Sequence, residues 1–251
     1  MRLVWEDHFD GPSLNTSRWN VLQQVHRGGV YTAENVAIKD GMLILRTVAQ
    51  NLTIMQKGKP VDFYVSSGAV NTSGLMEQRR GRWQARVKLP MVSETQGYTL
   101  HSSIWLFANQ MAESGQSGCP QEIDIVEQYA RAPGAVSAAV GALHPFNGTK
   151  STGCRKVPYT RGSSTALGDW TSDWTTFSVD WAADWIAMTV NGELYAHWAQ
   201  PQAVAAFTDK LFLALTACVM ERLPVGSTDD RFPQEYLIDW VKVYEYTGDS
   251  E

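Results

Sequence analysis

The six residues 122–127, with the sequence EIDIVE, place three carboxylates between β-branched apolar residues. Alternation of this kind is typical of a β-strand with one wet face and one buried face. Glu122 and Asp124 then share the wet face, whereas Glu127 would point a charge into the core of a regular strand. One extra residue near Ile125-Val126, a β-bulge, returns Glu127 to the wet face. The stretch therefore predicts a bulged strand that presents three carboxylates on one face.

The same stretch allows a chemical interpretation and a purely structural one. With the bulge, Glu122 and Glu127 lie about four strand steps apart, roughly 13 Å at the backbone. Side chains that each lean inward by ~4 Å bring the two carboxyls to roughly 5 Å, the separation typical of a retaining glycosidase. In such an enzyme one carboxylate attacks the sugar while the other transfers protons. The alternative is a solvated acidic strand face without chemistry, the more common meaning of such a stretch by itself.

Size and charge exclude several kinds of partner. The chain has 251 residues, 44% of them hydrophobic, which is enough for one large all-β domain or two small ones. Its net charge is −5 and no basic run stands out, which argues against nucleic acid or an anionic membrane surface. The longest nearly apolar run, residues 211–220, is far too short to cross a bilayer. We expect a monomer that binds neither nucleic acid nor membrane.

Cysteines and glycosylation triplets bear on the compartment. Cys119 and Cys154 lie in polar, Gly-rich loops, where they either form a disulfide or remain separate thiols. Cys218 lies in the apolar run and is expected to be a buried free thiol; the absence of a CxxC pair argues against a zinc ribbon. Asn-x-Ser/Thr triplets, which fit a secreted glycoprotein, begin at Asn15, Asn51, Asn71 and Asn147. We expect a secreted protein whose signal peptide is not part of this sequence.

Tryptophan is the compositional outlier, with ten residues, five of which fall within residues 170–198. Most of these side chains should pack in the core. An indole face also matches the apolar face of a pyranose ring and tolerates its hydroxyl rim. We expect two to four of the ten tryptophans to line a sugar-binding groove.

Strand and turn signals recur along the whole chain without an internal repeat or a charged linker, so we predict a single domain over residues 1–251. Two segments predict hairpins, one around an Asp-Gly turn and one around an Asn-Gly turn: residues 36–46 and 185–195. Only residues 201–207 favour a helix, and a short one. Many short strands with little helix predict an all-β sandwich.

With these segments placed, the chain resembles glycoside hydrolase family 16 over nearly its whole length. Residues 122–127 match the family's catalytic signature in its bulged form, which is typical of laminarinase-like and agarase- or carrageenase-like members. Further segments similar to the family's strands are residues 5–11, 31–36, 81–90, 103–106 and 238–244. The resemblance implies a concanavalin A-like β-jelly roll of two curved antiparallel sheets, with the concave sheet forming the substrate groove.

The family's catalytic roles carry over to the three carboxylates. Glu122 would be the nucleophile that forms a glycosyl-enzyme, and Glu127 would protonate the leaving oxygen and then deprotonate water. Asp124 would lie between them and hydrogen-bond Glu122. Because three clustered carboxylates cannot all ionise freely, we expect Glu127 to have a raised pKa and Glu122 to be ionised, within one coupled titration.

The resemblance also implies contacts with the substrate and a metal. Trp105 would stack on a sugar near the cleavage point, and Asn35 and Arg82 would contact hydroxyls. His144, on the strand after the catalytic one, either faces the leaving-group side or is structural. Several family members carry a structural calcium on the convex side, and Asp239 with nearby backbone carbonyls could hold one, since calcium prefers oxygen ligands. No cofactor is required for catalysis.

Some positions depart from the family's pattern. Residues 117–121, with the sequence SGCPQ, stand where the family often carries Trp-Pro and a Gly before the nucleophile. Ala214 and Cys218-Val219 stand where a late concave strand often carries an Asn and a Gly-Gly pair. These changes lie at substrate-binding positions, so they leave the glucan specificity open while the three carboxylates are kept.

The leading hypothesis is a retaining endo-β-1,3-glucanase that acts on laminarin-type polysaccharide. Alternatives are a family 16 enzyme on mixed-linkage glucan or galactan, a transglycosylase that uses the same intermediate, and a non-catalytic glucan-binding lectin. A lectin would commonly lack a catalytic carboxylate, and this chain keeps all three. A sulfated galactan would need a basic groove, for which the candidates are Arg79, Arg80, Arg155, Lys156 and Arg161.

Overall fold

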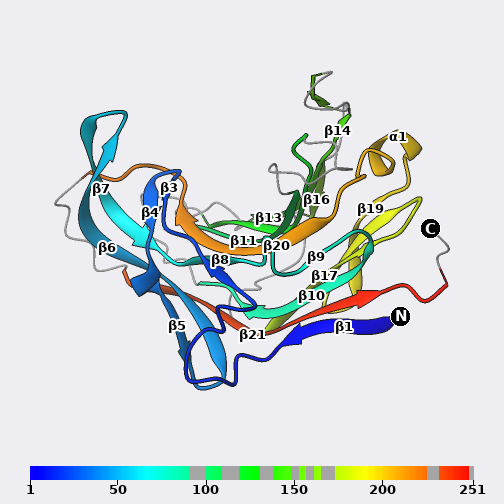
Figure 1. Cartoon of the computed structure of the whole chain (residues 1–251), viewed down its shortest axis with the longest axis horizontal. Helices are drawn as coiled ribbons and strands as arrows, with labels where there is room; N and C mark the ends of the chain where they lie inside the picture. The colour runs from blue at the N-terminus through cyan, green and yellow to red at the C-terminus, as the bar shows by residue number, and fades with distance from the viewer. Residues whose placement is uncertain are drawn as a thin grey trace.

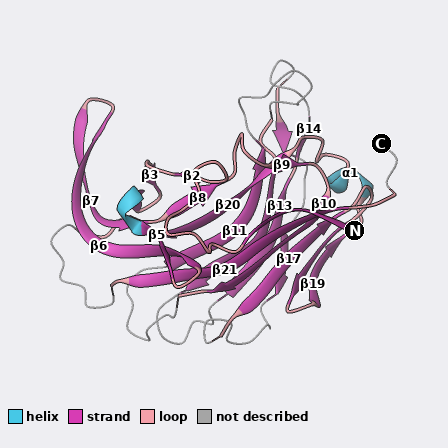
Figure 2. Ribbon diagram, turned by 60° about the horizontal axis from the view of Figure 1, so that its bottom comes forward, coloured by secondary structure: helices cyan, strands magenta, loops and turns pink. Residues whose placement is uncertain are grey.

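The computed structural model of the chain describes residues 1–90, 100–108, 119–130, 138–147, 153–156, 161–164, 173–224 and 232–248. Over these residues the chain forms two curved sheets that pack face to face, so the predicted all-β sandwich of jelly-roll type is confirmed (Figure 1, Figure 2). Among the same residues no helix is both long and apolar enough to span a bilayer.

The larger sheet has 11 strands within the described part of the chain. Its main path follows the order β19 (Glu193–Trp198), β18 (Ile186–Val190), β17 (Thr175–Trp181), β10 (Gly81–Lys88), β21 (Gln234–Glu245), β6 (Met42–Gln56), β7 (Lys59–Ser67), β4 (Gly29–Tyr31) and β3 (Val25–His26). Two more strands join this path, β1 (Arg2–Asp7) beside β21 and β5 (Val36–Lys39) beside β6.

The smaller sheet has eight strands over the same residues and carries the carboxylate-rich stretch. Its order is β16 (Arg161–Ser164), β13 (Ala138–His144), β12 (Glu122–Ala130), β11 (Leu100–Ala108), β20 (Leu211–Val219), β8 (Ala69–Asn71) and β2 (Asn20–Val21), with β9 (Glu77–Gln78) beside β20. Outside the two sheets lie the pair β14 (Phe146–Asn147) and β15 (Arg155–Lys156), the short helix α1 (Pro201–Val204) and the 3₁₀ turn η1 (Ala33–Asn35).

The core lies between the two sheets because alternate residues of each strand point inward. On β10, Trp83, Ala85 and Val87 are at most 1% exposed, and on β11, Ile104 and Leu106 join the same cluster. Fully burying a large aliphatic side chain is worth about 1.5–3 kcal/mol, so this alternation fixes which face of each strand is inside. The remaining face of the smaller sheet points away from the core, and we call it the concave face.

Both hairpins predicted from the sequence are present. Asp40 and Gly41 have φ of 53° and 71° between β5 and β6, and Asn191 and Gly192 have φ of 48° and 85° between β18 and β19. Two consecutive positive φ values characterise the tight turn that matches the twist of paired strands, and Asn, Asp and Gly adopt them at the least strain. The predicted helix forms over α1, shorter than the segment that favoured it.

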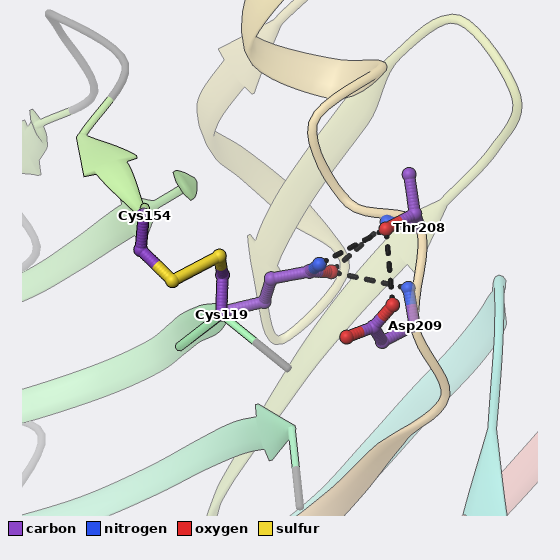
Figure 3. The surroundings of a disulfide bond; sticks show 5 residues. Cys119, Cys154, Thr208 and Asp209 are labelled. Atoms are coloured by element: carbon purple, nitrogen blue, oxygen red, sulfur yellow. Dashed lines mark hydrogen bonds between the residues drawn. A yellow bond between two sulfur atoms is a disulfide. The ribbon is translucent and has the colours of Figure 1, made fainter. Parts of the chain in front are cut away.

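Two contacts hold the start of β12 (Figure 3). Cys119 forms a disulfide with Cys154, with 5.5 Å between their Cα atoms, while Cys218 is a buried free thiol. Gln121 is fully buried; its Oε1 accepts from the backbone N–H of Thr208 at 2.9 Å and of Asp209 at 3.1 Å. The residues just before β12 are thereby tied to segments far away in the chain.

We predict that loss of the disulfide lowers stability substantially. The bond closes a loop with a sequence separation of 35 residues, which corresponds to about 3–4 kcal/mol of chain entropy. Cys154→Ser should lower the melting temperature by roughly 10 °C. Dithiothreitol should lower the melting temperature of the wild type by a similar amount and leave the variant unchanged. A wild type that is insensitive to dithiothreitol would contradict the prediction.

Candidate active site

The β-bulge predicted in the carboxylate-rich stretch is present. Along β11, Ile104 lies opposite Val126 and the next residue, Trp105, lies opposite Asp124, which leaves Ile125 without a partner. A second register shift occurs at the same place against β13. A bulge adds one residue without adding a step, so the three carboxylates share one face although the sequence spacing is odd. That face is the concave face.

The bulge is supported from the opposite sheet. An extra residue leaves a carbonyl that the strand ladder does not use, and a buried carbonyl needs a partner. The hydroxyl of Tyr195, on β19 of the larger sheet, donates a hydrogen bond to the carbonyl oxygen of Ile125. Gly141 on β13 leaves room for this ring, since a Cβ there would lie 2.9 Å from Tyr195 Cε2. The sandwich core thus positions the catalytic strand.

Glu122, Asp124 and His144 form one half of the site. His144 Nε2 lies 3.0 Å from Asp124 Oδ2 and 4.0 Å from Glu122 Oε1. Burial, and then the neighbouring charge of Asp124, raise the pKa of Glu122 to about 7, although His144 counteracts this. Burial and the charge of Glu127 raise the pKa of Asp124 well above its usual range. At neutral pH this half of the site therefore retains a proton.

The same three side chains are also where a metal could bind. Their potential ligand atoms lie within 4.8 Å of one another. The ion-pair contact between His144 Nε2 and Asp124 Oδ2, at 3.0 Å, accounts for the arrangement without an ion. We therefore describe these three side chains as a group that exchanges protons and not as a metal site.

Glu127 forms the other half of the site, and its ionisation is the reverse of the expectation. Burial alone would raise its pKa, but hydrogen bonds from His101 and Tyr129 hold the pKa below its usual range. His101 Nε2 and the Tyr129 hydroxyl lie 3.1 Å and 2.9 Å from the same oxygen, Oε1. The expectation of a raised pKa at Glu127 and an ionised Glu122 was wrong, because it omitted these two hydrogen-bond partners of Glu127.

His101 is the residue that sequence reasoning missed. It lies on β11 two residues before Ser103 and four before Trp105, so all three share the concave face by strand alternation. That periodicity was visible in the sequence, and it placed a histidine beside the catalytic strand. Nothing in the sequence showed which carboxylate the imidazole would meet.

The structure brings two of the four predicted substrate contacts to the carboxylates. Trp105 lies opposite Asp124, and its indole Nε1 donates to Thr216 Oγ1 at 3.2 Å, which leaves the half-buried ring on the concave face. His144 is the other. Asn35 is buried, and its amide donates to Thr32 and to Ser66 Oγ at 2.7 Å.

Arg82 and Asp239 lie elsewhere. Arg82, on the outer face of β10 in the larger sheet, makes a bidentate ion pair with Asp180 at 2.7 and 2.8 Å, so it does not reach the concave face. Asp239 on β21 is paired with the Arg86 guanidinium. A carboxylate already neutralised by arginine does not fit a calcium ion in this arrangement.

The chain has recognisable relatives. A model of glycosyl hydrolases family 16 matches residues 26–242. The chain belongs to this family. The resemblance drawn from the catalytic signature is thereby confirmed, and so is the enzyme class, a glycoside hydrolase.

This family 16 chain is similar in sequence to two curated proteins and in fold to a solved structure. The glucan endo-1,3-beta-glucosidase A1 of Niallia circulans is 26% identical over 98% of this chain and 38% of its own length. Beta-porphyranase B of Phocaeicola plebeius is 26% identical over 58% of this chain and 45% of its own. The chain thus spans less than half the length of either relative. A laminarinase catalytic domain from Thermotoga petrophila shares the fold, with a TM-score of 0.72 at 23% identity and 97% coverage of both chains.

We predict that Tyr195→Phe weakens both the fold and the site. The variant leaves the bulge carbonyl of Ile125 without its donor, which should cost about 1–3 kcal/mol of unfolding free energy. The turnover number should fall more than the substrate affinity, because the position of Glu127 depends on the bulge. Urea unfolding and steady-state kinetics measure the two effects.

Tyr236→Phe is the matched control. Tyr236 is also a core tyrosine, but no hydrogen bond to its hydroxyl is found among the described residues. Its loss should leave stability unchanged or slightly higher. Equal effects of the two substitutions would contradict a role for Tyr195 at the bulge.

We also predict a pH-dependent gain in stability for Glu122→Gln. The folded pKa of about 7 exceeds the ordinary value of 4.5, so the folded state binds more protons between these values. The ionisation of Glu122 therefore destabilises the wild type increasingly as the pH rises from about 4.5 to about 7. Above about pH 7 the variant should be more stable by about 1–2 kcal/mol, and below about pH 4 the two should be equal. Urea unfolding measures this, and a pH-independent difference would refute it.

Proposed function

We propose that this chain is a retaining endo-β-1,3-glucanase that cleaves laminarin-type polysaccharide by double displacement. The observation that carries the proposal is the bulged strand β12, which holds Glu122, Asp124 and Glu127 together beside the indole of Trp105. A retaining glycosidase requires two carboxyl groups, one for attack and one for proton transfer. Similarity to a glucan endo-1,3-beta-glucosidase supports the choice of substrate.

The proposed reaction has two steps. Glu122 attacks the anomeric carbon while Glu127 gives a proton to the departing glycosidic oxygen, and a glycosyl-enzyme forms. Glu127 then takes a proton from water, which displaces Glu122 and releases the sugar with retained configuration. Asp124 and His144 keep the Glu122 carboxylate in place, and the Trp105 ring offers an apolar platform for a pyranose.

The pKa shifts of Glu122 and Glu127 run opposite to the ionisation that the first step needs. The raised pKa of Glu122 and the lowered pKa of Glu127 put the proton on the attacking side of the site. The three groups titrate together, so a bound sugar that contacts one of them changes the others. The first step requires an ionised Glu122 and a proton available at Glu127.

A galactan with anionic groups is the second candidate, and Arg27 favours it. This residue is exposed on the turn between β3 and β4. Burial raises the pKa values of Asp124 and Tyr129, and the positive charge of Arg27 offsets part of that rise. An unbranched neutral glucan has no group to use such a charge, whereas a sulfate would. One curated relative is a beta-porphyranase. Activity on a sulfated galactan that is lost in Arg27→Gln would favour this candidate.

We also propose that the protein is secreted. The disulfide between Cys119 and Cys154 fits an oxidising compartment. Among the glycosylation triplets, Asn15 and Asn51 are exposed, whereas Asn71 on β8 is half-buried.

The decisive experiment combines activity with chemical rescue. Wild-type protein should release new reducing ends from laminarin, and Glu122→Gln should lower the rate by at least about 10³-fold. Glu127→Ala should lower it by about 10²–10⁴-fold. With an aryl β-glucoside of an activated phenol, azide should rescue both Ala variants at these positions, because a small anion can enter the vacated space.

The anomeric configuration of the azide product separates the roles of the two residues. Glu127→Ala should give the β-glycosyl azide, since azide attacks the glycosyl-enzyme in place of water. Glu122→Ala should give the α-glycosyl azide by direct displacement. The reverse pattern would exchange the two roles. Tight laminarin binding without any new reducing end would favour the non-catalytic lectin over the enzyme.

A further inference from the structure

Two side chains from neighbouring strands form hydrogen bonds with one oxygen of Glu127. His101 Nε2 on β11 and the Tyr129 hydroxyl on β12 lie 3.1 Å and 2.9 Å from Oε1. Among the described residues no hydrogen bond reaches the second oxygen, Oε2. The Glu127 carboxyl is therefore held through Oε1, whereas Oε2 remains available to exchange a proton with a substrate. A general acid or base needs such an available oxygen.

The imidazole of His101 is itself fixed. It is 5% exposed, its Nδ1 lies 3.1 Å from Ser103 Oγ, and its ring meets the Tyr129 ring edge-on at 4.8 Å. Cys218 Sγ lies 3.9 Å from the same nitrogen. A ring confined on all these sides cannot turn away from Glu127. Ser103 can either donate to Nδ1 or accept from it, so both neutral tautomers and the imidazolium are accommodated.

We propose that His101 is the positioning residue of Glu127 and that the two side chains share the single proton delivered to the leaving oxygen. The inference deepens the proposed function, on which it rests, by assigning a residue outside the carboxylate signature to the acid–base step. It also explains how an ionised Glu127 can obtain the proton that it must give to the leaving oxygen. A carboxyl held in its ionised form is a poor acid alone, whereas an adjacent imidazole can keep the proton one hydrogen bond away.

The proton balance of the pair is closed. Before reaction the pair carries one exchangeable proton, either as a carboxyl donating to neutral Nε2 or as a carboxylate accepting from the imidazolium. In the first step the proton passes through Glu127 to the glycosidic oxygen as the bond from that oxygen to the anomeric carbon breaks and the bond from Glu122 forms. In the second step water gives a proton to Glu127 and its oxygen to the anomeric carbon, and Glu122 leaves. The pair then holds one proton again.

Other charged and titratable groups surround the pair and bear on its pH dependence. They come from β12, β13 and β20 and from the β3–β4 hairpin: Glu122, Asp124, Tyr129, His144, Cys218, His26, Arg27 and Tyr31. Any pH profile of the site is therefore a property of the cluster. A test of His101 needs readouts that separate proton supply from simple packing.

The kinetic test varies the leaving group. His101→Ala should lower kcat/KM on laminarin and on an unactivated phenyl laminaribioside by about 10²–10⁴-fold. On the dinitrophenyl analogue, whose leaving group departs without a proton, kcat/KM should stay within about threefold of wild type.

Two further variants separate position from proton supply. His101→Gln keeps a donor toward Glu127 but cannot hold the proton. It should therefore restore the position of Glu127 and the melting temperature without restoring the rates on the unactivated substrates. Tyr129→Phe, which removes the other donor, should show a smaller difference between the two aryl substrates.

A second readout does not depend on the substrate. Carbon-13 NMR of the labelled Glu127 carboxyl, in the wild type and in His101→Gln, should show a higher titration midpoint in the variant, because a neutral amide stabilises the carboxylate less than an imidazole that can share the proton. A loss of equal size on all three substrates, or an unchanged carboxyl titration, would overturn the proposal. Failure of the wild type on laminarin would instead refute the glucanase assignment, and the NMR result would still decide the role of His101.

Discussion

A single extra residue in β12, Ile125, decides where the charge of Glu127 lies. In a regular strand that carboxylate would enter the core, where an unpaired charge is very costly. The bulge turns it to the concave face but frees a backbone carbonyl, which the Tyr195 hydroxyl meets from the larger sheet. The geometry of the catalytic strand therefore depends on how the two sheets pack, so a change in the core also changes the active site.

The second constraint is electrostatic. Three carboxylates on one face of a strand cannot all ionise, and their neighbours decide which one keeps a proton. The imidazole of His144 lies beside Asp124 and Glu122, and that of His101 lies beside Glu127, so a histidine flanks each end of the cluster. Burial raises all three pKa values, and only Glu127 has enough donors to reverse this. The negative charge of the cluster is therefore favoured at the Glu127 end.

How far the sequence predicts this protein can be judged from particular residues. The bulge and the Asp40-Gly41 and Asn191-Gly192 turns were predicted correctly, since each rests on neighbours in the chain. Arg82 was expected at the substrate, but it pairs with Asp180 on the outer face of the larger sheet. Strand alternation shows that Arg82 lies on the face of β10 that points away from the core. It cannot show to which of the two sheets β10 belongs.

By itself the sequence determined the all-β class, the family and the three carboxylates on one strand face, because side-chain alternation and turn chemistry act over a few residues. Only the tertiary structure decided the ionisation of those carboxylates. The contacts that set it join residues 26 positions apart between His101 and Glu127, and 70 apart between Ile125 and Tyr195. Such pairs form only when strands from distant parts of the chain come into register, and that register depends on the packing of the whole sandwich.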